Sequence, residues 1–251
     1  MKPRPAPGAK SIRDDALDSL HSKVSAAMVL LLAVATGLAA GRNPNLAVLP
    51  AGAAPLGRTY GDWAAAWWTW ALQFPLEQNP MTDTTGAYGS AGQKGPVWFL
   101  ADTFDGSAER SLTIPAGRRI FFPLFNVFND YSCPEPDNRP APGQSLEEFL
   151  TEGAEALTDM ATGLFAEVDG VPIQHLWDYR AHSGMEMFTK HPSLSAFDPC
   201  PTGGPQPAVV AGYWLMLAPL PKGQHTLRFG STARFGDFEF GVDATYYLTV
   251  D

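Results

Sequence analysis

Four tryptophans within eight residues are the first candidates for binding chemistry: Trp63, Trp67, Trp68 and Trp70. Flat indole rings suit stacking on the apolar faces of sugars and on other flat ligands. Trp63, Trp67 and Trp70, continued by Phe74, follow a helical period, which favours packing of that face against a core. Trp68 falls outside this face, so an exposed Trp68 would indicate ligand binding.

An acidic loop and one histidine supply the other polar candidates. Residues 126–138 carry Asn126, Asp130 and Asp137, and oxygen-rich loops suit Ca²⁺. Their spacing does not match an EF-hand, so a solvated acidic loop is the alternative. His182 belongs to no HxH or HExxH zinc motif. The candidate ligand-binding residues are Trp68, Trp98, Asp130 and His182, and the candidate calcium ligands are Asn126, Asp130 and Asp137.

Catalytic motifs are missing from the sequence. It contains no G-x-S-x-G elbow, no Ser-x-x-Lys, no P-loop and no G-x-G-x-x-G. A carboxylate pair for glycoside cleavage needs a defined separation in space, which the sequence does not supply. His225 shares a strand face with Leu227 and Phe229, which predicts a structural histidine bonded to backbone or carboxylate. These observations favour a non-catalytic protein.

The two cysteines are Cys133 and Cys200, each followed by proline in a loop-like stretch. In an exported protein a disulfide is the default state of such a pair. The bond would close a long loop and stabilise the fold by roughly 4 kcal/mol on the chain-entropy model. Two free thiols are the alternative.

The charge of the chain restricts its partners. The 251 residues include 17 basic and 26 acidic ones, for a formal charge of −9. Without residues 1–40 the balance is 12 basic against 23 acidic residues, or −11. Such a charge argues against nucleic acid or anionic lipid as the main partner.

The N-terminal segment is typical of an export signal. Residues 24–40 carry no charge, five basic residues precede them, and small residues follow the apolar run. We therefore expect a signal peptide over 1–40 and a secreted or periplasmic protein, with an uncleaved N-terminal anchor as the alternative. Residues 41–57 are rich in Pro, Gly and Ala and predict a flexible linker. A single domain is expected over 58–251.

Two helices are expected within that domain. The tryptophan period predicts the first over 60–74, ended by Pro75. The second is expected over 145–161, because Ser145 and Glu148 form a capping box ahead of an apolar stripe.

Elsewhere the hydrophobic period is two, most clearly over 237–251. Asp169-Gly170 predicts a two-residue hairpin. Turns at 115–117 and 221–223 are expected to fold 118–127 back onto 109–114 and to return the following strand onto 208–218. The fold class predicted is mainly β: an antiparallel, jelly-roll-like β-sandwich with two α-helices.

Several blocks together resemble an uncharacterised family of exported bacterial β-rich proteins. They are TYGDWAAAWWTWALQFP, NPMTDTTGAYG, GQKGPVWFLA, LTIPAGRRIFFPLFN and GQHTLRFG, and they span about residues 58–251. The resemblance implies export and a β-rich fold, and it brings no catalytic assignment. Members of the family often carry Cys at two places where this chain has residues such as Gly89 and Leu112.

Three functional hypotheses follow. The first is an exported, non-catalytic β-sandwich that binds a carbohydrate or another envelope or extracellular ligand. The second is a secreted hydrolase or lyase acting on a polysaccharide. The third is a self-assembling structural protein of the cell envelope.

Overall fold

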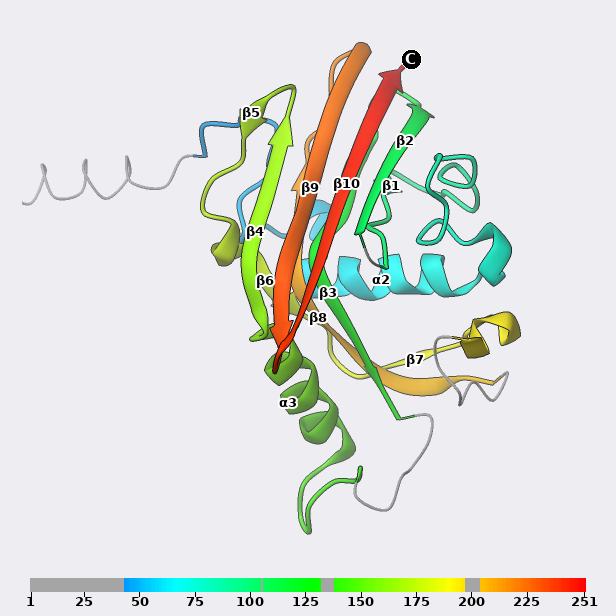
Figure 1. Ribbon diagram of the computed structural model, residues 1–251, viewed down its shortest axis with the longest axis vertical. Coiled ribbons are helices and arrows are strands. Elements are labelled where there is room, and N and C mark those ends of the chain that lie inside the picture. Colours follow the sequence, from blue (N-terminus) through cyan, green and yellow to red (C-terminus); the bar gives the residue numbers. More distant parts are fainter. Residues whose placement is uncertain (1–42, 105, 132–137, 197–203) are drawn as a thin grey trace, which may run out of the picture. The chain divides into compact units, whose positions relative to one another are not determined.

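The computed structural model describes residues 43–104, 106–131, 138–196 and 204–251. This part of the chain forms two β-sheets that pack face to face and two α-helices, α2 and α3 (Figure 1). The prediction of a mainly-β sandwich with two α-helices is confirmed. None of the helices in the described ranges has the length and apolar character needed to cross a membrane.

The first sheet, sheet A, has the strand order β1-β3-β8-β6, with β7 also paired to β8. Its strands are β1 (Val97–Phe99), β3 (Arg119–Asp130), β6 (Arg180–His182), β7 (Glu186–Phe188) and β8 (Gln206–Leu217). The long β3 and β8 run antiparallel, whereas β1 is parallel to β3. Because β1 pairs only with Arg119–Phe121, the later part of β3 has β8 as its one strand neighbour among the described strands.

The second sheet, sheet B, has the order β2-β10-β9-β4-β5. Its strands are β2 (Gly106–Ile114), β4 (Ala161–Val168), β5 (Val171–Pro172), β9 (Gly223–Phe235) and β10 (Phe238–Val250). Inward and outward residues alternate along β10 from Val242 to Val250, as the period of two predicted. The edge strand β2 runs parallel to β10. Each sheet therefore contains one parallel strand pair beside the antiparallel pairing that was expected.

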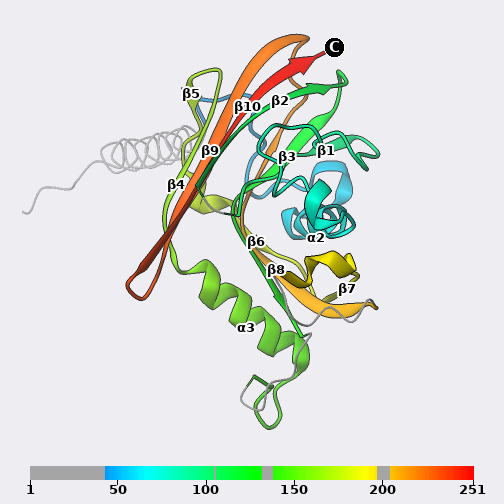
Figure 2. The same ribbon diagram turned by 45° about the vertical axis from the view of Figure 1, so that its right-hand side comes forward.

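Helix α2 (Tyr60–Leu72) lies against the face of sheet A that sheet B does not cover (Figure 2). Thr59 and Asp62 form a capping box at its start. Aromatic side chains fill the contact. The ring centroids of Trp67 and Trp214 of β8 are 5.6 Å apart, and the Trp214 ring stacks on Phe121 of β3 with a centroid distance of 5.4 Å. The tryptophan stripe is therefore core, as its helical period favoured.

The contact between the sheets uses the alternate residues of the same strands. Phe122 of β3 points to the other side of sheet A from Phe121 and meets Phe229 of β9 at 4.4 Å. Phe229 in turn stacks on Tyr246 of β10 at 5.9 Å. The period-two geometry of β3 thus gives one strand two buried faces, one toward α2 and one toward sheet B.

Helix α3 (Leu146–Thr158) begins at the predicted Ser145–Glu148 capping box. It packs on β8 and β3, and Leu150 and Ala154 are its buried apolar residues. It ends at Thr158, three residues before the expected end, because β4 begins at Ala161.

Of the three predicted hairpin turns, the one that joins two strands of the same sheet forms a hairpin, and the two that join strands of different sheets do not. Asp169-Gly170 does form a hairpin, joining β4 to β5 with both residues at positive φ. The turns at 115–117 and 221–223 do not form hairpins, because each carries the chain from one sheet to the other. Turn residues reverse the direction of the chain locally, whereas the strand that pairs with each neighbour of the turn depends on contacts with strands far away in the sequence.

The prediction of a flexible linker over 41–57 is wrong for residues 43–57. Leu49 N donates to Met216 O at 2.8 Å, and Ala218 N donates to Ala47 O at 2.7 Å. Asn45 donates from its side chain to Val171 O at 2.9 Å. These residues belong to the same compact unit as the sandwich, which begins at Asn43.

Candidate functional site

A cavity of about 210 Å³ lies beside the later part of β3, where β1 has ended. Its walls come from α2, β3, β9, β10 and the segments that flank β1. The apolar lining residues are Met81, Phe104, Phe125, Phe128, Phe240 and Val242. The polar lining residues are Trp68, Asp102, Thr103, Asn126 and Ser231. Apolar walls with a few polar groups are typical of small-molecule sites.

Trp68 lines this cavity, but it is not an exposed surface residue. Only 9% of it is accessible, and its ring packs against Phe128 at 4.8 Å and Trp67 at 5.2 Å. The expectation that Trp68 lies off the buried face is therefore wrong. Its indole Nε1 is nevertheless buried without a hydrogen-bond partner.

Ser231 of β9 contributes a second unpartnered group. Its side chain is 1% accessible, and its Oγ also has no hydrogen-bond partner. A buried polar group without a partner costs about 1–3 kcal/mol, so native structures rarely keep one without a reason. Trp98 and Trp214 have unpartnered indole nitrogens as well, but neither residue lines this cavity.

Asp102 brings a buried carboxyl group to the cavity wall. The residue is 7% accessible, and its Oδ2 accepts a hydrogen bond from Nδ2 of Asn126 at 2.6 Å. Burial raises the pKa of Asp102 from 3.8 to about 7, against the opposing effects of the Arg110 guanidinium and the Asn126 amide. Near neutral pH this carboxyl group is therefore present in both its protonated and its ionised form.

Arg110 fixes the segments that carry Asp102. The guanidinium is 1% accessible and donates to the carbonyl oxygens of Asp83 at 2.6 Å, Ala101 at 2.7 Å and Asp102 at 2.9 Å. It also donates to the hydroxyl of Tyr246 at 2.8 Å, and that hydroxyl donates to Ala101 O at 2.7 Å. The backbone of Asp102 is thus tied to β2 and β10 of sheet B.

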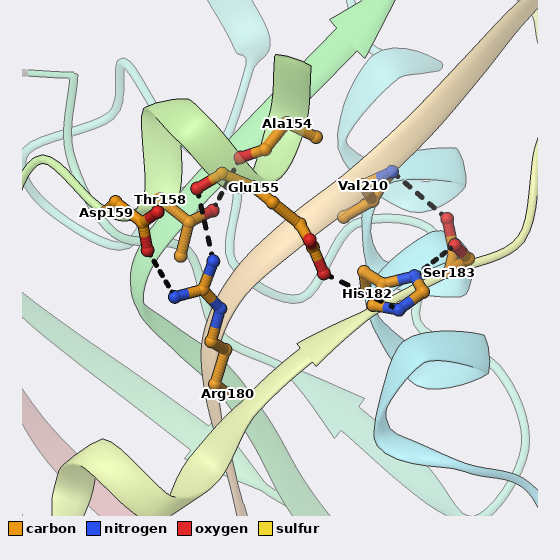
Figure 3. A network of polar contacts seen from close by, with 8 residues as sticks. All are labelled: Ala154, Glu155, Thr158, Asp159, Arg180, His182, Ser183 and Val210. Carbon is orange, nitrogen blue, oxygen red and sulfur yellow. Dashed lines mark hydrogen bonds and ion pairs between the residues drawn. The ribbon is translucent and has the colours of Figure 1, made fainter. Parts of the chain in front are cut away.

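The predicted residue His182 lies outside the cavity lining, at the end of β6 (Figure 3). Its side chain is half exposed, and Nε2 lies 3.8 Å from a carboxylate oxygen of Glu155 in α3. Nδ1 lies 3.0 Å from the carbonyl oxygen of Ser183. The neighbouring Arg180 pairs with Asp159 just beyond α3. This network joins α3 to β6.

Asp130 is also away from the cavity lining. Its carboxylate pairs with the ammonium group of Lys190, which is 4% accessible and lies over the ring of Phe128. Asn126, the other described residue of the calcium hypothesis, is bonded to Asp102 instead. No group of three or more metal-binding side chains occurs in the ranges that the structure covers.

Three of the predicted residues lie outside the described residues: Asp137, Cys133 and Cys200. The calcium site and the disulfide therefore stay predictions. Trp98 is described, lies on β1 and is 8% accessible, so it offers no open face to a ligand. Of the predicted ligand and calcium residues, the cavity brings together Trp68 and Asn126.

Asp102, Arg110 and Ser231 belong to no sequence motif and were not among the predicted site residues. The alternation of inward and outward residues along β2 and β9 could have indicated Arg110 and Ser231. Arg110 follows Ala108 and precedes Leu112 on the inward face of β2, and Ser231 follows Phe229 on the inward face of β9. A polar residue at a core position of a strand predicts a buried polar cluster.

No protein-family model matches the chain, and no curated protein matches it. Among solved structures, the cysteine protease inhibitor EhICP2 from Entamoeba histolytica aligns with 62% of this chain and 96% of its own, at 13% identity and a TM-score of 0.24. Amebosin aligns with 63% of this chain and 100% of its own, at 8% identity and a TM-score of 0.20. Likenesses this distant carry no information about function.

Proposed function

We propose that this chain is an exported, non-catalytic binding protein that holds a small ligand in the cavity beside Trp68. The observation that carries the proposal is a pair of buried, unpartnered polar atoms, Trp68 Nε1 and Ser231 Oγ, in the lining of one cavity. Both atoms have almost no accessible surface, so a ligand bonds to them only when the lining side chains shift, and such bonds would remove the cost of leaving the two atoms unpaired. Carbohydrate is the first ligand class to test.

The binding mode differs from the stacking that the tryptophan cluster suggested. The Trp68 ring packs against two aromatic rings, those of Phe128 and Trp67, so part of its surface is engaged within the protein. Trp68 would act through its N–H group as a hydrogen-bond donor. Because only 9% of Trp68 is accessible, a small ligand in the cavity is expected, and an extended polysaccharide lying on an open sheet face is not.

A binding role fits the lining better than glycoside hydrolysis does. Glycosidases use two carboxyl groups about 5–9.5 Å apart across the scissile bond. The described lining of the cavity contains one carboxyl group, that of Asp102. One carboxyl group with a bonded amide and a hydroxyl is sufficient to orient a ligand.

Export is the second part of the proposal, and it rests on the charge-free run at 24–40 and the basic residues before it. Intact-mass analysis of the exported protein tests it. We expect a mass that lacks residues 1–40 and a bond between Cys133 and Cys200. Retention of the segment would contradict the signal peptide, and two free thiols would contradict the disulfide.

Binding is tested by a thermal-shift screen against neutral small compounds: monosaccharides, polyols, phenols and short amides. The matched variants are Ser231→Leu, which fills the cavity, and Ser107→Leu, which places the same side chain at an exposed position of β2. A ligand at a hundred times its Kd stabilises the native state by about 2.7 kcal/mol, enough to raise the Tm by several degrees.

The expected result is a compound that raises the Tm of the wild type and of Ser107→Leu but not of Ser231→Leu. Circular dichroism at 20 °C checks that Ser231→Leu is folded. The proposal is refuted if no compound shifts the wild type, or if every shift persists in Ser231→Leu.

A further inference from the structure

The polar groups of the cavity specify what the ligand must offer, given the proposed binding function. Trp68 Nε1 can only donate a hydrogen bond, and the Ser231 hydroxyl can donate or accept. Asp102 accepts one bond from Asn126, and a carboxylate has further acceptor sites. The ligand therefore needs an acceptor for Trp68 and a donor for Asp102. Hydroxyl groups provide both.

The charges around the cavity disfavour ionic ligands. An anion would face the carboxyl group of Asp102 and gain no direct partner from Arg110, whose bonds go to carbonyl oxygens and to the Tyr246 hydroxyl. A cation would be attracted by the ionised carboxylate of Asp102, but it would also be repelled by the positive charge of the Arg110 guanidinium, which acts electrostatically on Asp102. Like charges in a buried site repel strongly because the surroundings have a low dielectric constant. A neutral ligand avoids both costs.

The size of the cavity sets the third condition. Its volume of about 210 Å³ is below the roughly 300–1,000 Å³ of sites for drug-sized ligands. That space suits one six-membered ring with its substituents. Phe125, Phe240 and Val242 present the apolar surface that the C–H face of a sugar ring prefers.

We infer that the ligand is a neutral monosaccharide-sized polyol, with one hydroxyl donating to Asp102 and one oxygen accepting from Trp68 Nε1. Asp102 is the group that selects neutral hydroxyl compounds, and Ser231 makes the third bond. The inference rests on the proposed function and adds the ligand class and the anchoring residue. An end-on sugar unit of a larger glycan would satisfy the same contacts only if the rest of the chain left the cavity.

The protonation state of Asp102 gives the inference an independent readout. An ionised carboxylate accepts a stronger hydrogen bond from a hydroxyl than a protonated carboxyl does. Since burial raises the pKa of Asp102 to about 7, affinity for the polyol should rise as the pH increases from 5.5 to 8.5. Within the described part of the chain, Arg110 from β2 and Tyr246 from β10 are the ionisable groups that act on it. Both keep one charge state over this pH range, because Arg is always protonated and burial raises the pKa of Tyr246.

The experiment compares three probes that share one ring. At pH 6.5, D-glucose is neutral, D-glucosamine carries an ammonium group and D-glucuronate carries a carboxylate, and the three are compared at this pH. D-Galactose and D-mannose test the other hydroxyl orientations. Affinities are measured by calorimetry or ligand-observed NMR for the wild type, Asp102→Asn and Asp243→Asn. Asp243 is the matched control, because it pairs with Arg228 and is not part of the cavity lining.

We expect at least one neutral hexose to bind, with glucosamine and glucuronate at least tenfold weaker than glucose or its best epimer. Asp102→Asn should weaken the neutral hexose tenfold or more and remove the pH dependence, whereas Asp243→Asn should change neither. Should Asp102→Asn fail to fold, the pH profile of the wild type decides alone. Binding of a phenol, amide or charged sugar in preference to every neutral hexose would overturn this inference but leave the proposed function intact. Failure of every compound in the earlier screen would overturn both.

Discussion

The carboxyl group of Asp102 should make the ligand-free protein less stable as the pH rises. Burial raises its pKa in the folded state to about 7 from 3.8, so the folded protein holds this proton more tightly than the unfolded chain does. Between these two pH values the folded state binds more protons, and the free energy of unfolding therefore falls with increasing pH. Above about pH 7 the full cost of the buried charge is present.

The size of this effect follows from the pKa shift. A shift of about three units corresponds to about 4 kcal/mol, at ~1.4 kcal/mol per unit. That is a large part of the roughly 5–15 kcal/mol by which a domain is stable. Asn at position 102 has nearly the same shape and still accepts a bond from Asn126, but it does not ionise. Asp102→Asn should therefore be more stable than the wild type at pH 8, by up to about 4 kcal/mol, and close to it at pH 4.

Urea unfolding at a series of pH values between 4 and 8.5 measures this difference. Subtracting the wild-type curve from the variant curve removes contributions that both proteins share. Asp83→Asn serves as a control of opposite sign: burial acts to raise the pKa of Asp83, but bonds from the Tyr88 and Thr85 amides outweigh it and lower that pKa. Asp83→Asn should therefore lose stability at neutral pH. Parallel pH profiles for the wild type and Asp102→Asn would refute the reasoning.

Two further changes test the fold around the site. Gly61→Ala should destabilise the protein by about 3 kcal/mol in urea unfolding, because the added Cβ would lie 1.9 Å from the backbone oxygen of His182. A change in the free energy of unfolding of less than about 0.5 kcal/mol would contradict this close packing of α2 on β6. Burial acts to lower the pKa of His225, but bonds to Asp169 and to Pro221 O outweigh it and raise that pKa. The proton of His225 should therefore stabilise the fold below about pH 6.5. This stabilisation should be lost as the pH rises through the raised pKa. His225→Gln should remove this slope between pH 5.5 and 8, and an unchanged slope would contradict it.

The elements that local interactions specify were predictable from the sequence. The Ser145–Glu148 capping box predicted the start of α3, and the tryptophan period with Pro75 predicted α2. The Thr59–Asp62 capping box of α2 is equally local, because its residues are three apart, but it was not among the predictions. The period of two in β10 likewise depends on neighbouring residues alone. His225 also behaves as the strand pattern indicated, because both its ring nitrogens lie within hydrogen-bonding distance of an oxygen, one from a carboxylate and one from the backbone.

The elements that depend on distant partners were not predictable in this way. A proline–glycine turn at 115–117 reverses the chain, but Ala116 N donates to Asp251 O, so the turn is held by the far end of the chain. The parallel pairing of β2 with β10 has the same non-local origin. The candidate site combines residues from α2, β3, β9 and β10, and their spacing along the chain does not indicate that they lie close together in the fold. Trp68 was selected for its residue type, and its burial against Phe128 depends on where β3 lies.

The cost of burying the ionised Asp102 carboxylate is connected with the hydrogen bonds by which Arg110 holds the backbone of Asp102. A buried carboxyl group that costs stability when ionised would tend to turn its segment outward to water. Arg110 prevents this by bonding to the carbonyl oxygens of Ala101 and Asp102 on one side and Asp83 on the other. Those bonds hold the backbone and leave the carboxyl group of Asp102 at the cavity wall beside Asn126. These hydrogen bonds hold the segment in place, but they do not offset the cost of ionising Asp102. A ligand hydroxyl donated to that acid would provide the compensation, which is why affinity and stability should respond to the same proton with opposite signs.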